Sequence, residues 1–257
     1  MVPTRNCAPT IGAIAQTLAS LRERGLIDQA VVVDADSADG TAEIARAAGI
    51  EAVSENALLP QFGPARGKGD AMWRALSVCR GDVVCYLDGD SGHFGEHFVA
   101  GTVGPLLFVP GAEFVKAFFR RPFRDGHPED GGRVTELTAR PLLRRFWPEL
   151  AEVRQPLAGE MAARRDLLLR LPFSTGYAVE TALLLDVYAE VGLGGLAQVD
   201  LDVRQNAHKP LPELAPMADE VLAAAAVRLQ RRGLLAPDGA PAPLERPPMA
   251  SVRAAAA

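Results

Sequence analysis

The amino-acid sequence predicts an α/β fold in which helices cover both faces of a mainly parallel sheet. Three observations support this prediction. Residues 30–49 pass from a β-branched run through an acidic loop into a helical pattern that ends at Gly49. Residues 68–81 place apolar side chains at helical spacing, and residues 82–88 form an almost entirely apolar strand, as expected between two helical layers. Strands and helices alternating in this order build a doubly wound sheet with right-handed crossovers.

The composition is that of a globular chain and limits its partners. The 257 residues are 48% hydrophobic and 23% charged, enough for a full core. The net charge of −5 argues against a nucleic-acid partner. No apolar run is long enough to span a bilayer, and the N-terminus lacks a signal-peptide pattern, so we expect no membrane partner. Three cysteines without a C-x-x-C pair fit reduced thiols, which leads us to expect a cytoplasmic protein.

The apolar strand that should lead into the first turn is nearly missing. After a start at Met1 and Val2, the chain enters a Pro-x-x-Asn turn and a helix that begins near Ala8. Without that strand, unpaired backbone groups and a cavity would each cost roughly several kcal/mol. We expect a start site placed too far downstream, or a degraded copy.

The second half predicts a different arrangement. Strands are expected over 113–123 and 196–204, and helices over 131–150, 157–171 and 177–193. The first of these helices is entered through two glycines and is expected to break at Pro141 or to restart there. Residues 235–257 are rich in Pro and Ala, and most of them are expected to be extended or disordered. These patterns divide the chain into residues 1–108, 109–234 and a tail over 235–257.

Asp88, Gly89 and Asp90 form the first candidate site, at the end of the apolar strand. Two carboxylates one residue apart can bind a divalent cation such as Mg²⁺ or Mn²⁺. The alternative is an ordinary solvated turn, since Asp and Gly are common in turns. The position of the pair after a buried strand favours the metal site. Ligands of doubly wound sheets bind beyond the carboxyl ends of the strands, where this loop and the acidic loop after residue 33 meet.

The acidic loop over 34–41 supplies a second candidate. An acidic residue at a strand end can accept hydrogen bonds from a ribose or a base, and we assign this role to Asp34. Helix capping explains the rest of the loop, and we assign it to Ser37 and Asp39.

Two glycine-rich segments predict anion binding. Lys68 lies between glycines at a helix start, although the segment does not satisfy the P-loop pattern. The segment GGRVTEL (131–137) combines free N–H groups, a guanidinium and a hydroxyl at another helix start. A flexible loop with a solvated lysine, and a glycine-entered helix with a surface arginine, are the alternatives.

Glu180 and His208 are less specific. Glu180 stands near the start of an apolar helix, where it would be costly to bury without a partner. It either orients sugar hydroxyls or faces water. A lone histidine such as His208 is more often structural than a ligand.

Taken together, the motifs resemble those of glucosyl-3-phosphoglycerate synthases, which are retaining GT-A glycosyltransferases related to mannosyl-3-phosphoglycerate synthases. The motifs follow the same order over nearly the whole chain: VPTRNCAPTIG, VVVDADSADGT, ARGKGDAMWRAL, YLDGD, GGRVTELTARPLL, QPLAGE, LPFSTGYAVE, VDLDVR and ERPPM. The resemblance implies a GT-A fold, a Rossmann-like parallel sheet joined to a smaller helical acceptor-binding part. It also implies transfer of glucose from UDP-glucose to the 2-hydroxyl of 3-phosphoglycerate with Mg²⁺, in a homodimer.

The resemblance assigns roles to residues of this chain. It implies catalytic roles for Lys68, Asp88 and Glu180. The residues that would contact the donor are Asp34, assigned above, and Pro3, Thr4, Arg5, Ala35, Lys68, Asp88, Gly89, Leu157, Tyr177 and Glu180. The acceptor would contact Gly132, Arg133, Val134, Thr135 and His208. The metal would be held by Asp90, Asn206 and Asp88. Retention without an evident nucleophile implies a front-face route, in which the leaving phosphate helps to deprotonate the incoming hydroxyl.

Two further departures from the family pattern keep other readings open. Cys7 stands where the family has an acidic residue. The family pattern Arg-x-His-x-Asn is replaced by Arg-Gln-Asn-Ala-His over 204–208, which puts Asn206 at the metal position and is expected to lower metal affinity. The alternatives are a mannosyltransferase that uses GDP-mannose, an enzyme with another acceptor acid, or a non-catalytic relative that binds nucleotide sugars.

Overall fold

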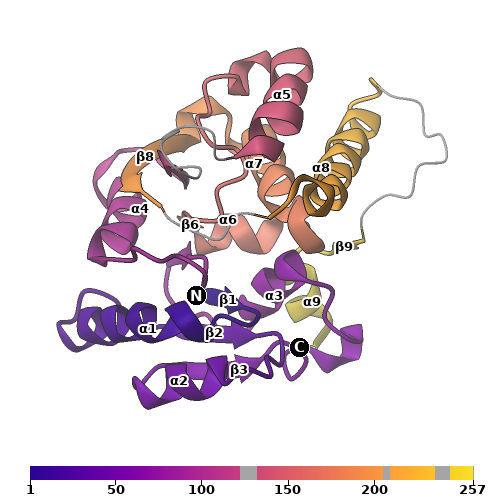
Figure 1. Ribbon diagram of the computed structural model, residues 1–257. Coiled ribbons are helices and arrows are strands. Elements are labelled where there is room, and N and C mark those ends of the chain that lie inside the picture. The colour runs from indigo at the N-terminus through magenta and orange to yellow at the C-terminus, as the bar shows by residue number, and fades with distance from the viewer. Residues whose placement is uncertain (122–131, 205–208, 235–243, 257) are drawn as a thin grey trace.

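The computed structural model describes residues 1–121, 132–204, 209–234 and 244–256 (Figure 1). Residues 253–256 are described by their backbone alone. The first half contains, in order, β1 (Val2–Thr4), α1 (Ala8–Glu23), β2 (Val31–Asp34), α2 (Thr41–Ala47), β3 (Glu51–Ser54), η1 (Pro60–Phe62), α3 (Lys68–Ala75), β4 (Val83–Tyr86) and α4 (Glu96–Phe108). Within the described residues, no helix has the length and apolarity needed to cross a membrane.

The second half adds short strands between helices. Its elements are β5 (Phe114–Arg120), the π-helical segment η2 (Thr135–Ala139), α5 (Arg140–Phe146), η3 (Pro148–Leu150), β6 (Met161–Arg164), α6 (Arg165–Arg170), β7 (Phe173–Ser174), η4 (Gly176–Ala178), α7 (Val179–Val191), η5 (Leu193–Gly195), β8 (Leu196–Val203), α8 (Leu211–Arg231), β9 (Glu245–Arg246) and α9 (Met249–Ala256).

The strands confirm the mainly parallel sheet. β1, β2 and β3 pair in parallel, with Val2 opposite Val32. A second sheet has the order β4-β6-β5-β8, in which β6 is antiparallel to both neighbours and β5 is parallel to β8. The terminal amino group of Met1 donates to the Cys85 carbonyl at 2.9 Å, and the Leu87 N–H donates to the Met1 carbonyl at 3.1 Å. These two bonds join β1 to β4, so that the carboxyl ends of all these strands except the antiparallel β6 lie along one edge.

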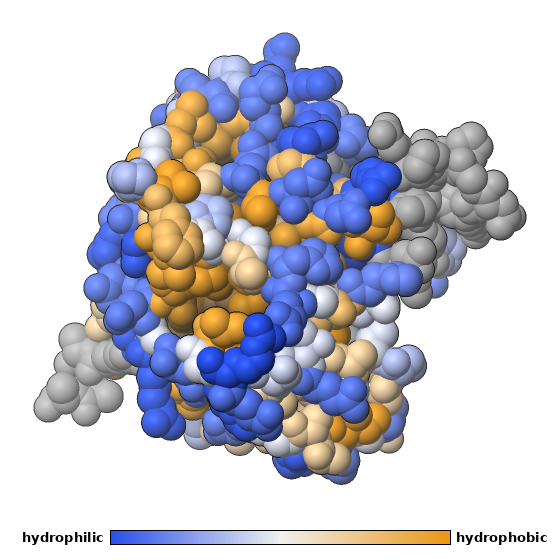
Figure 2. Space-filling model, turned by 90° about the vertical axis from the view of Figure 1, so that its left-hand side faces the viewer, coloured by the Kyte–Doolittle hydropathy of each residue, from blue (hydrophilic) through white to orange (hydrophobic). Residues whose placement is uncertain are grey.

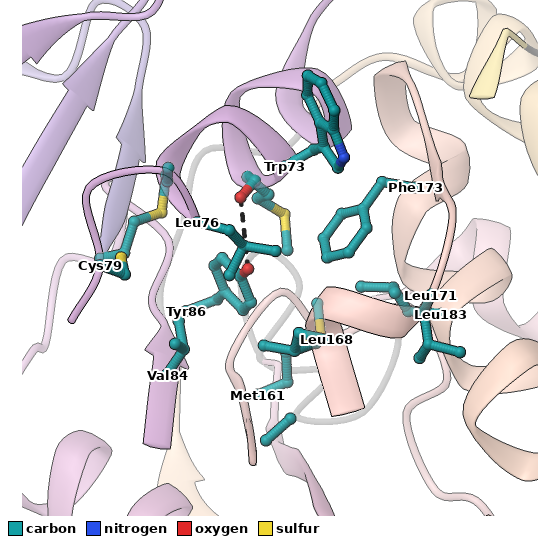
Figure 3. Close-up of a cluster of buried hydrophobic side chains, with 14 of the residues drawn as sticks. Trp73, Leu76, Cys79, Val84, Tyr86, Met161, Leu168, Leu171, Phe173 and Leu183 are labelled. Atoms are coloured by element: carbon teal, nitrogen blue, oxygen red, sulfur yellow. Dashed lines mark hydrogen bonds between the residues drawn. The ribbon is translucent and has the colours of Figure 1, made fainter. Parts of the chain in front are cut away.

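Alternating apolar residues cover both faces of the sheet. Val32 belongs to a buried cluster with residues of α1, α2 and α4, while its neighbours Val31 and Val33 belong to a cluster with residues of α3, α6 and α7. Figure 3 shows the second cluster, in which Tyr86 of β4 lies between α3 and α6 and its hydroxyl donates to the Met72 carbonyl at 3.3 Å. Two helical layers therefore hold the sheet, as the alternation of strands and helices predicts.

One helix predicted for the second half is wrong, and another is confirmed in its restart at Pro141. Residues 157–171 are not one helix, because Met161–Arg164 form β6 and only Arg165–Arg170 are helical. Ala-rich segments favour helix, but pairing of β6 with β4 and β5 on its two edges outweighs that preference. The expected restart of a helix at Pro141 is confirmed, since α5 begins at Arg140 after the π-helical segment η2 and has Pro141 in its first turn, where a proline costs little.

The expectation of an extended or disordered tail is wrong for Met249–Ala256, which form the helix α9. Glu245 and Arg246 pair with β7 in an antiparallel register, and Met249 is buried in the cluster around Trp73. In Figure 1 this yellow segment returns to the N-terminal half, beside α3. The apolar contacts of Met249 stabilise a segment that its Pro- and Ala-rich composition assigned to the solvent.

The first strand is present but short. β1 has three residues, and a groove runs between β2 and β4 next to Met1. Apolar residues of α1 and α4, among them Leu18, Val99 and Val103, line the groove. Figure 2 views the side of the molecule that carries α4 and shows hydrophobic residues gathered in a hollow there. All three residues of β1 nevertheless pair in parallel with β2.

Candidate functional site

The candidate donor site is a cavity of about 630 Å³ at the carboxyl ends of the parallel strands. Its lining includes the turn after β1, the start of α3 and the loop after β4, with further residues after β2 and β3 and from η4 and α8. The predicted donor residues that line it are Pro3, Thr4, Arg5, Ala35, Lys68, Asp88, Gly89 and Tyr177, together with Cys7 and Asp90. Side chains far apart in the sequence thus meet where the sheet topology places ligands.

A second cavity of about 200 Å³ adjoins the first. Its lining includes the predicted acceptor residues Gly132, Arg133, Val134 and Thr135, and also Leu157, Glu180, Arg204 and Lys209. Lys68, Asp88, Asp90 and Tyr177 line both cavities. The two spaces therefore meet at these side chains.

Lys68 is held between two carboxylates at this junction. Its Nζ lies 2.5 Å from Asp88 Oδ1 and 2.6 Å from Glu180 Oε1. Burial alone lowers the pKa of Lys68, but the charges of Asp88 and Glu180 outweigh it and hold the pKa above its ordinary value. The side chain of Glu180 is 6% exposed, so its partner is this ammonium group rather than water. A permanent positive charge is thus fixed at the first turn of α3.

Arg204 lies between the two acids of the Asp-Gly-Asp loop. Its Nη2 is 2.8 Å from Asp88 Oδ2 and 2.6 Å from Asp90 Oδ1, and its Nε is 3.2 Å from Glu160 Oε1. Burial raises the pKa of Asp88, but Lys68 and Arg204 outweigh it, so the net shift is downward. For Glu160, burial dominates and raises the pKa. The cationic group between the two aspartates is therefore a guanidinium in this structure.

The two aspartates differ in how open they are to a metal ion. Asp88 has one oxygen on Lys68 and the other on Arg204, so it is not open to a cation. Asp90 has a side chain 56% exposed and faces both cavities, which fits a hard oxygen ligand. Asn206 lies outside the described residues, and among those that are described no three His, Cys, Asp or Glu side chains cluster as ligands. Asp90 fits a divalent cation whose other ligands come from phosphate oxygens.

Asp34 does not line either cavity. It is 3% exposed, and its carboxylate accepts hydrogen bonds from Thr4 Oγ1 and Ser37 Oγ, both at 2.8 Å, and from the Ser37 N–H at 2.7 Å. A carboxylate used in this way stabilises the loop and is not available to a nucleoside. Ser37 does not cap α2 either, because its hydroxyl accepts from the Asn6 N–H.

Asp39 confirms the capping role. Its Oδ1 accepts from the Thr41 N–H at 3.1 Å at the start of α2, and its Oδ2 accepts from the Ala8 N–H at 3.0 Å at the start of α1. One side chain therefore stabilises the beginnings of two helices.

The acceptor side is built around a left-handed glycine. Gly132 has a φ of 82°, and its carbonyl accepts from the Glu136 N–H at 3.0 Å. Arg133 Nη2 donates to the Lys209 carbonyl at 2.5 Å, and Lys209 Nζ lies 5.0 Å from the ring centre of Tyr177. Gly131 and His208 lie outside the described residues. The described part brings two cations to a cavity wall that also carries the Thr135 side chain.

Sequence reasoning missed Arg204, Glu160 and Lys116. Lys116 lies on β5 behind the junction, donates to the Ala158 carbonyl at 2.6 Å, and has a pKa lowered to about 8 by burial. A charged residue inside or directly after an apolar strand was the available signal for Lys116 and Arg204. Glu160 gave none, because β6 was taken for a helix.

Glycines next to the junction are required by close packing. A Cβ on Gly159 would lie 2.2 Å from Asp88 Oδ1, and one on Gly69 would lie 1.9 Å from the Ser174 carbonyl oxygen. Side chains at these positions would displace Asp88 or the first turn of α3.

Comparisons with known proteins agree with this geometry. Residues 1–103 match the family model of glycosyl transferase family 2. A glucosyl-3-phosphoglycerate synthase of Mycolicibacterium smegmatis is 45% identical over 226 residues, which cover 87% of this chain and 74% of that protein.

Two solved structures extend the likeness to nearly the whole chain. Mannosyl-3-phosphoglycerate synthase of Rubrobacter xylanophilus has a TM-score of 0.91 at 48% identity, covering 98% of this chain and 88% of the other. Glucosyl-3-phosphoglycerate synthase of Mycobacterium tuberculosis, in complex with Mn²⁺, UDP-glucose and phosphoglyceric acid, has a TM-score of 0.88 at 40% identity, covering 98% and 89%. The mixed α/β architecture is thus the GT-A fold of these enzymes, and the chain belongs to the glucosyl-3-phosphoglycerate synthase family of glycosyltransferases.

Proposed function

We propose that this protein transfers glucose from UDP-glucose to the 2-hydroxyl of 3-phosphoglycerate with retention of configuration. The observation that carries the proposal is the junction of two cavities at Lys68, Asp88, Asp90 and Tyr177. A transferase that joins two substrates needs a donor space and an acceptor space that meet at charged groups. Further support comes from the M. tuberculosis relative, whose structure holds UDP-glucose and phosphoglyceric acid together.

The donor cavity has the lining that a nucleotide sugar requires. Pro3, Thr4 and Arg5 would border the uridine, with Ala35 beside the base. Lys68 would meet the diphosphate and Asp88 the glucose, and Leu157, Tyr177 and Glu180 would surround the sugar. Because Glu180 and Asp88 already bind the same ammonium group, their carboxylates are oriented before a sugar arrives.

A divalent cation fits beside Asp90. Mg²⁺ or Mn²⁺ held there, with Asn206 as a further proposed ligand, would neutralise the charge of the departing diphosphate. The Lys68 ammonium group adds positive charge on the same side of the junction. Asp88 binds the side chains of Lys68 and Arg204. We therefore assign it to orienting the donor sugar and these two side chains.

The acceptor side suits a small dianion. Gly132, Arg133, Val134 and Thr135 would bind the phosphate and carboxylate of 3-phosphoglycerate through backbone N–H groups, the guanidinium and the hydroxyl. His208 is a further proposed contact. A 3-phosphoglycerate bound in this way would direct its 2-hydroxyl toward the junction, where the anomeric carbon of the donor would lie.

The structure suits a front-face reaction. The bond from the anomeric carbon to the phosphate oxygen breaks, and the acceptor oxygen bonds to the same face of that carbon. The acceptor proton passes to the leaving phosphate oxygen of UDP. In this route Lys68 stabilises the leaving charge, and no protein nucleophile is needed.

A second candidate donor is GDP-mannose. The R. xylanophilus structure, at 48% identity, belongs to a mannosyl-3-phosphoglycerate synthase. The two donors differ in base and in the configuration at one sugar carbon, and both fit the same phosphate contacts.

We also propose that the protein is a cytoplasmic homodimer. Each chain would divide into a nucleotide-sugar-binding part over 1–108, an acceptor-binding part over 109–234 and a C-terminal segment over 235–257. The cysteines at 7, 79 and 85 are free thiols, which suits a reducing compartment. Light scattering at micromolar concentration should give twice the chain mass of 27.3 kDa. A single-chain mass at every concentration would contradict the dimer.

A panel of donors and acceptors tests the proposed reaction. With Mg²⁺ and 3-phosphoglycerate, UDP-glucose should give the highest kcat/KM, and proton NMR should show an α-glucoside, because front-face attack retains the configuration. GDP-mannose, another acceptor acid and a reaction without acceptor serve as comparisons. If GDP-mannose exceeds UDP-glucose tenfold, the donor assignment is wrong, and if no donor reacts, the protein is a non-catalytic relative.

Replacement of Lys68 by Met should lower kcat/KM by about 10²–10³-fold, since it removes a charge placed at the leaving group. Arg24→Met is the matched control, because Arg24 forms an exposed ion pair with Glu96 and should leave kcat/KM within twofold. Circular dichroism should confirm that both variants are folded at the assay temperature. A folded Lys68→Met protein with kcat/KM within threefold of the original would exclude the assigned role.

Metal titration of two variants distinguishes the proposed roles of Asp88 and Asp90. Asp90→Asn should raise the Mn²⁺ concentration for half-maximal activity at least tenfold, because Asp90 is the carboxylate open to the cation. Asp88→Asn should instead lower the melting temperature and kcat, because Lys68 and Arg204 lose a buried partner. Calorimetric titration of Mn²⁺ with UDP present gives the same comparison without turnover. Equal metal affinities for Asp90→Asn and the original protein would contradict the assignment.

A further inference from the structure

The C-terminal segment Leu244–Met249, here called the C-terminal strap, lies against the helix that carries Lys68. β9 of the strap pairs with β7, with Arg246 opposite Phe173. The Thr175 N–H donates to the Leu244 carbonyl at 3.0 Å, and Trp73 Nε1 of α3 donates to the Pro247 carbonyl at 2.8 Å. The motif ERPPM that forms the strap has no part in the two cavities.

Arg246 binds Asp70 in the first turn of α3 through a bidentate ion pair. Its Nε lies 2.8 Å from Asp70 Oδ1, and its Nη2 lies 2.7 Å from Asp70 Oδ2. Asp70 is fully buried and Arg246 is 6% exposed. The guanidinium carbon lies 5.5 Å and 5.6 Å from the ring centres of Phe62 and Trp73. The planar guanidinium group of Arg246, held near two aromatic rings, fixes the orientation of the Asp70 carboxylate, which the flexible ammonium group of a lysine would not do.

Asp70 passes this constraint to the entrance of α3. Its Oδ2 accepts from the Arg66 N–H at 2.9 Å, and its Oδ1 accepts from Arg74 Nε at 3.2 Å. The loop before Lys68 and the next turn of the helix are therefore tied to one carboxylate. Lys68 is two residues before Asp70 in that turn.

The same contacts reach the segment that leads to Glu180. The Gly176 N–H donates to the Arg66 carbonyl at 3.0 Å. A Cβ on Gly67 would lie 3.2 Å from Gly176 Cα, and Gly69 packs directly against the Ser174 carbonyl. Since the strap contacts both α3 and β7, it supports both ends of the Lys68–Glu180 contact.

We propose that Arg246 is a positioning residue for glycosyl transfer, which acts through Asp70 to hold Lys68 between Asp88 and Glu180. The inference rests on the proposed function only in naming the reaction that is affected. A displacement of about 1 Å at a group that contacts the leaving phosphate is enough to lower the rate severalfold to a hundredfold. Arg246 lines neither cavity, so its effect must be indirect.

Three variants test the proposal. Arg246→Lys keeps the positive charge and loses the bidentate contact with Asp70. The pair Asp70→Asn with Arg246→Met removes both charges of this ion pair, while the buried Arg74 loses its carboxylate partner and keeps its hydrogen bonds to the carbonyls of Leu58 and Gly63. Arg231→Lys is the matched control, because Arg231 binds Glu245 of the same strap from α8 without touching α3.

The readouts are kcat, KM for each substrate, the calorimetric Kd for UDP-glucose with Mg²⁺, and amide hydrogen exchange over residues 66–71. For Arg246→Lys we expect kcat/KM for UDP-glucose to fall at least tenfold, Kd for UDP-glucose to rise at least fivefold, and exchange over 66–71 to increase. The KM for 3-phosphoglycerate should stay within twofold. The double variant should behave in the same way, and Arg231→Lys should stay within twofold of the original protein throughout.

The outcomes separate the two proposals. Unchanged exchange and unchanged donor affinity in folded Arg246→Lys or in the double variant would overturn the positioning role. So would equal losses for Arg231→Lys, or a fall in activity that merely follows the folded fraction. If the original protein transfers no glucose to 3-phosphoglycerate, the proposed function fails, while exchange and UDP-glucose affinity still decide whether Arg246 positions Lys68.

Discussion

Lys68 between Asp88 and Glu180 is the interaction on which the two-sided site depends. Its ammonium group comes from the first turn of α3, and its partners come from the loop after β4 and the first turn of α7. A buried charge is costly to leave unpaired, and removing Lys68 would take away the ammonium group that Glu180 binds. Because the three elements lie far apart in the sequence, this contact also fixes the donor cavity against the acceptor cavity.

Arg204 balances the remaining acids in the same region. It lies on Asp88, Asp90 and Glu160 together, and its pKa is raised because these charges outweigh its burial. The aspartate pair is therefore held in a fixed geometry by protein groups before any phosphate arrives. Both carboxylates line the cavities, but the side chain of Asp90 is 56% exposed against 14% for Asp88, so Asp90 is the one more open to a cation and a diphosphate. Preorganisation of this kind lowers the cost of stabilising charge that develops during transfer.

Support for Lys68 comes from outside the cavities. The buried pair Asp70–Arg246 and the strand pairing of β7 with β9 connect the C-terminal strap to the start of α3. Glu245 of the strap accepts from Arg228 at 2.6 Å, which ties α8 to the same point. The donor site is thus held by both halves of the chain.

The sequence by itself determined the parallel sheet, the Asp-Gly-Asp loop at the end of β4 and the glycine-flanked Lys68 at a helix start, because strand composition, helical spacing and glycine placement are local signals. Family resemblance supplied Glu180 and Tyr177 as donor residues, and the structure places both beside Lys68. Only the tertiary structure showed that Asp34 turns inward to Ser37, that Met161–Arg164 form a strand, that Arg204 lies between the two aspartates, and that the strap binds Asp70. Each of these depends on a partner distant in sequence or on which way a side chain turns, and local propensity carries no information about either.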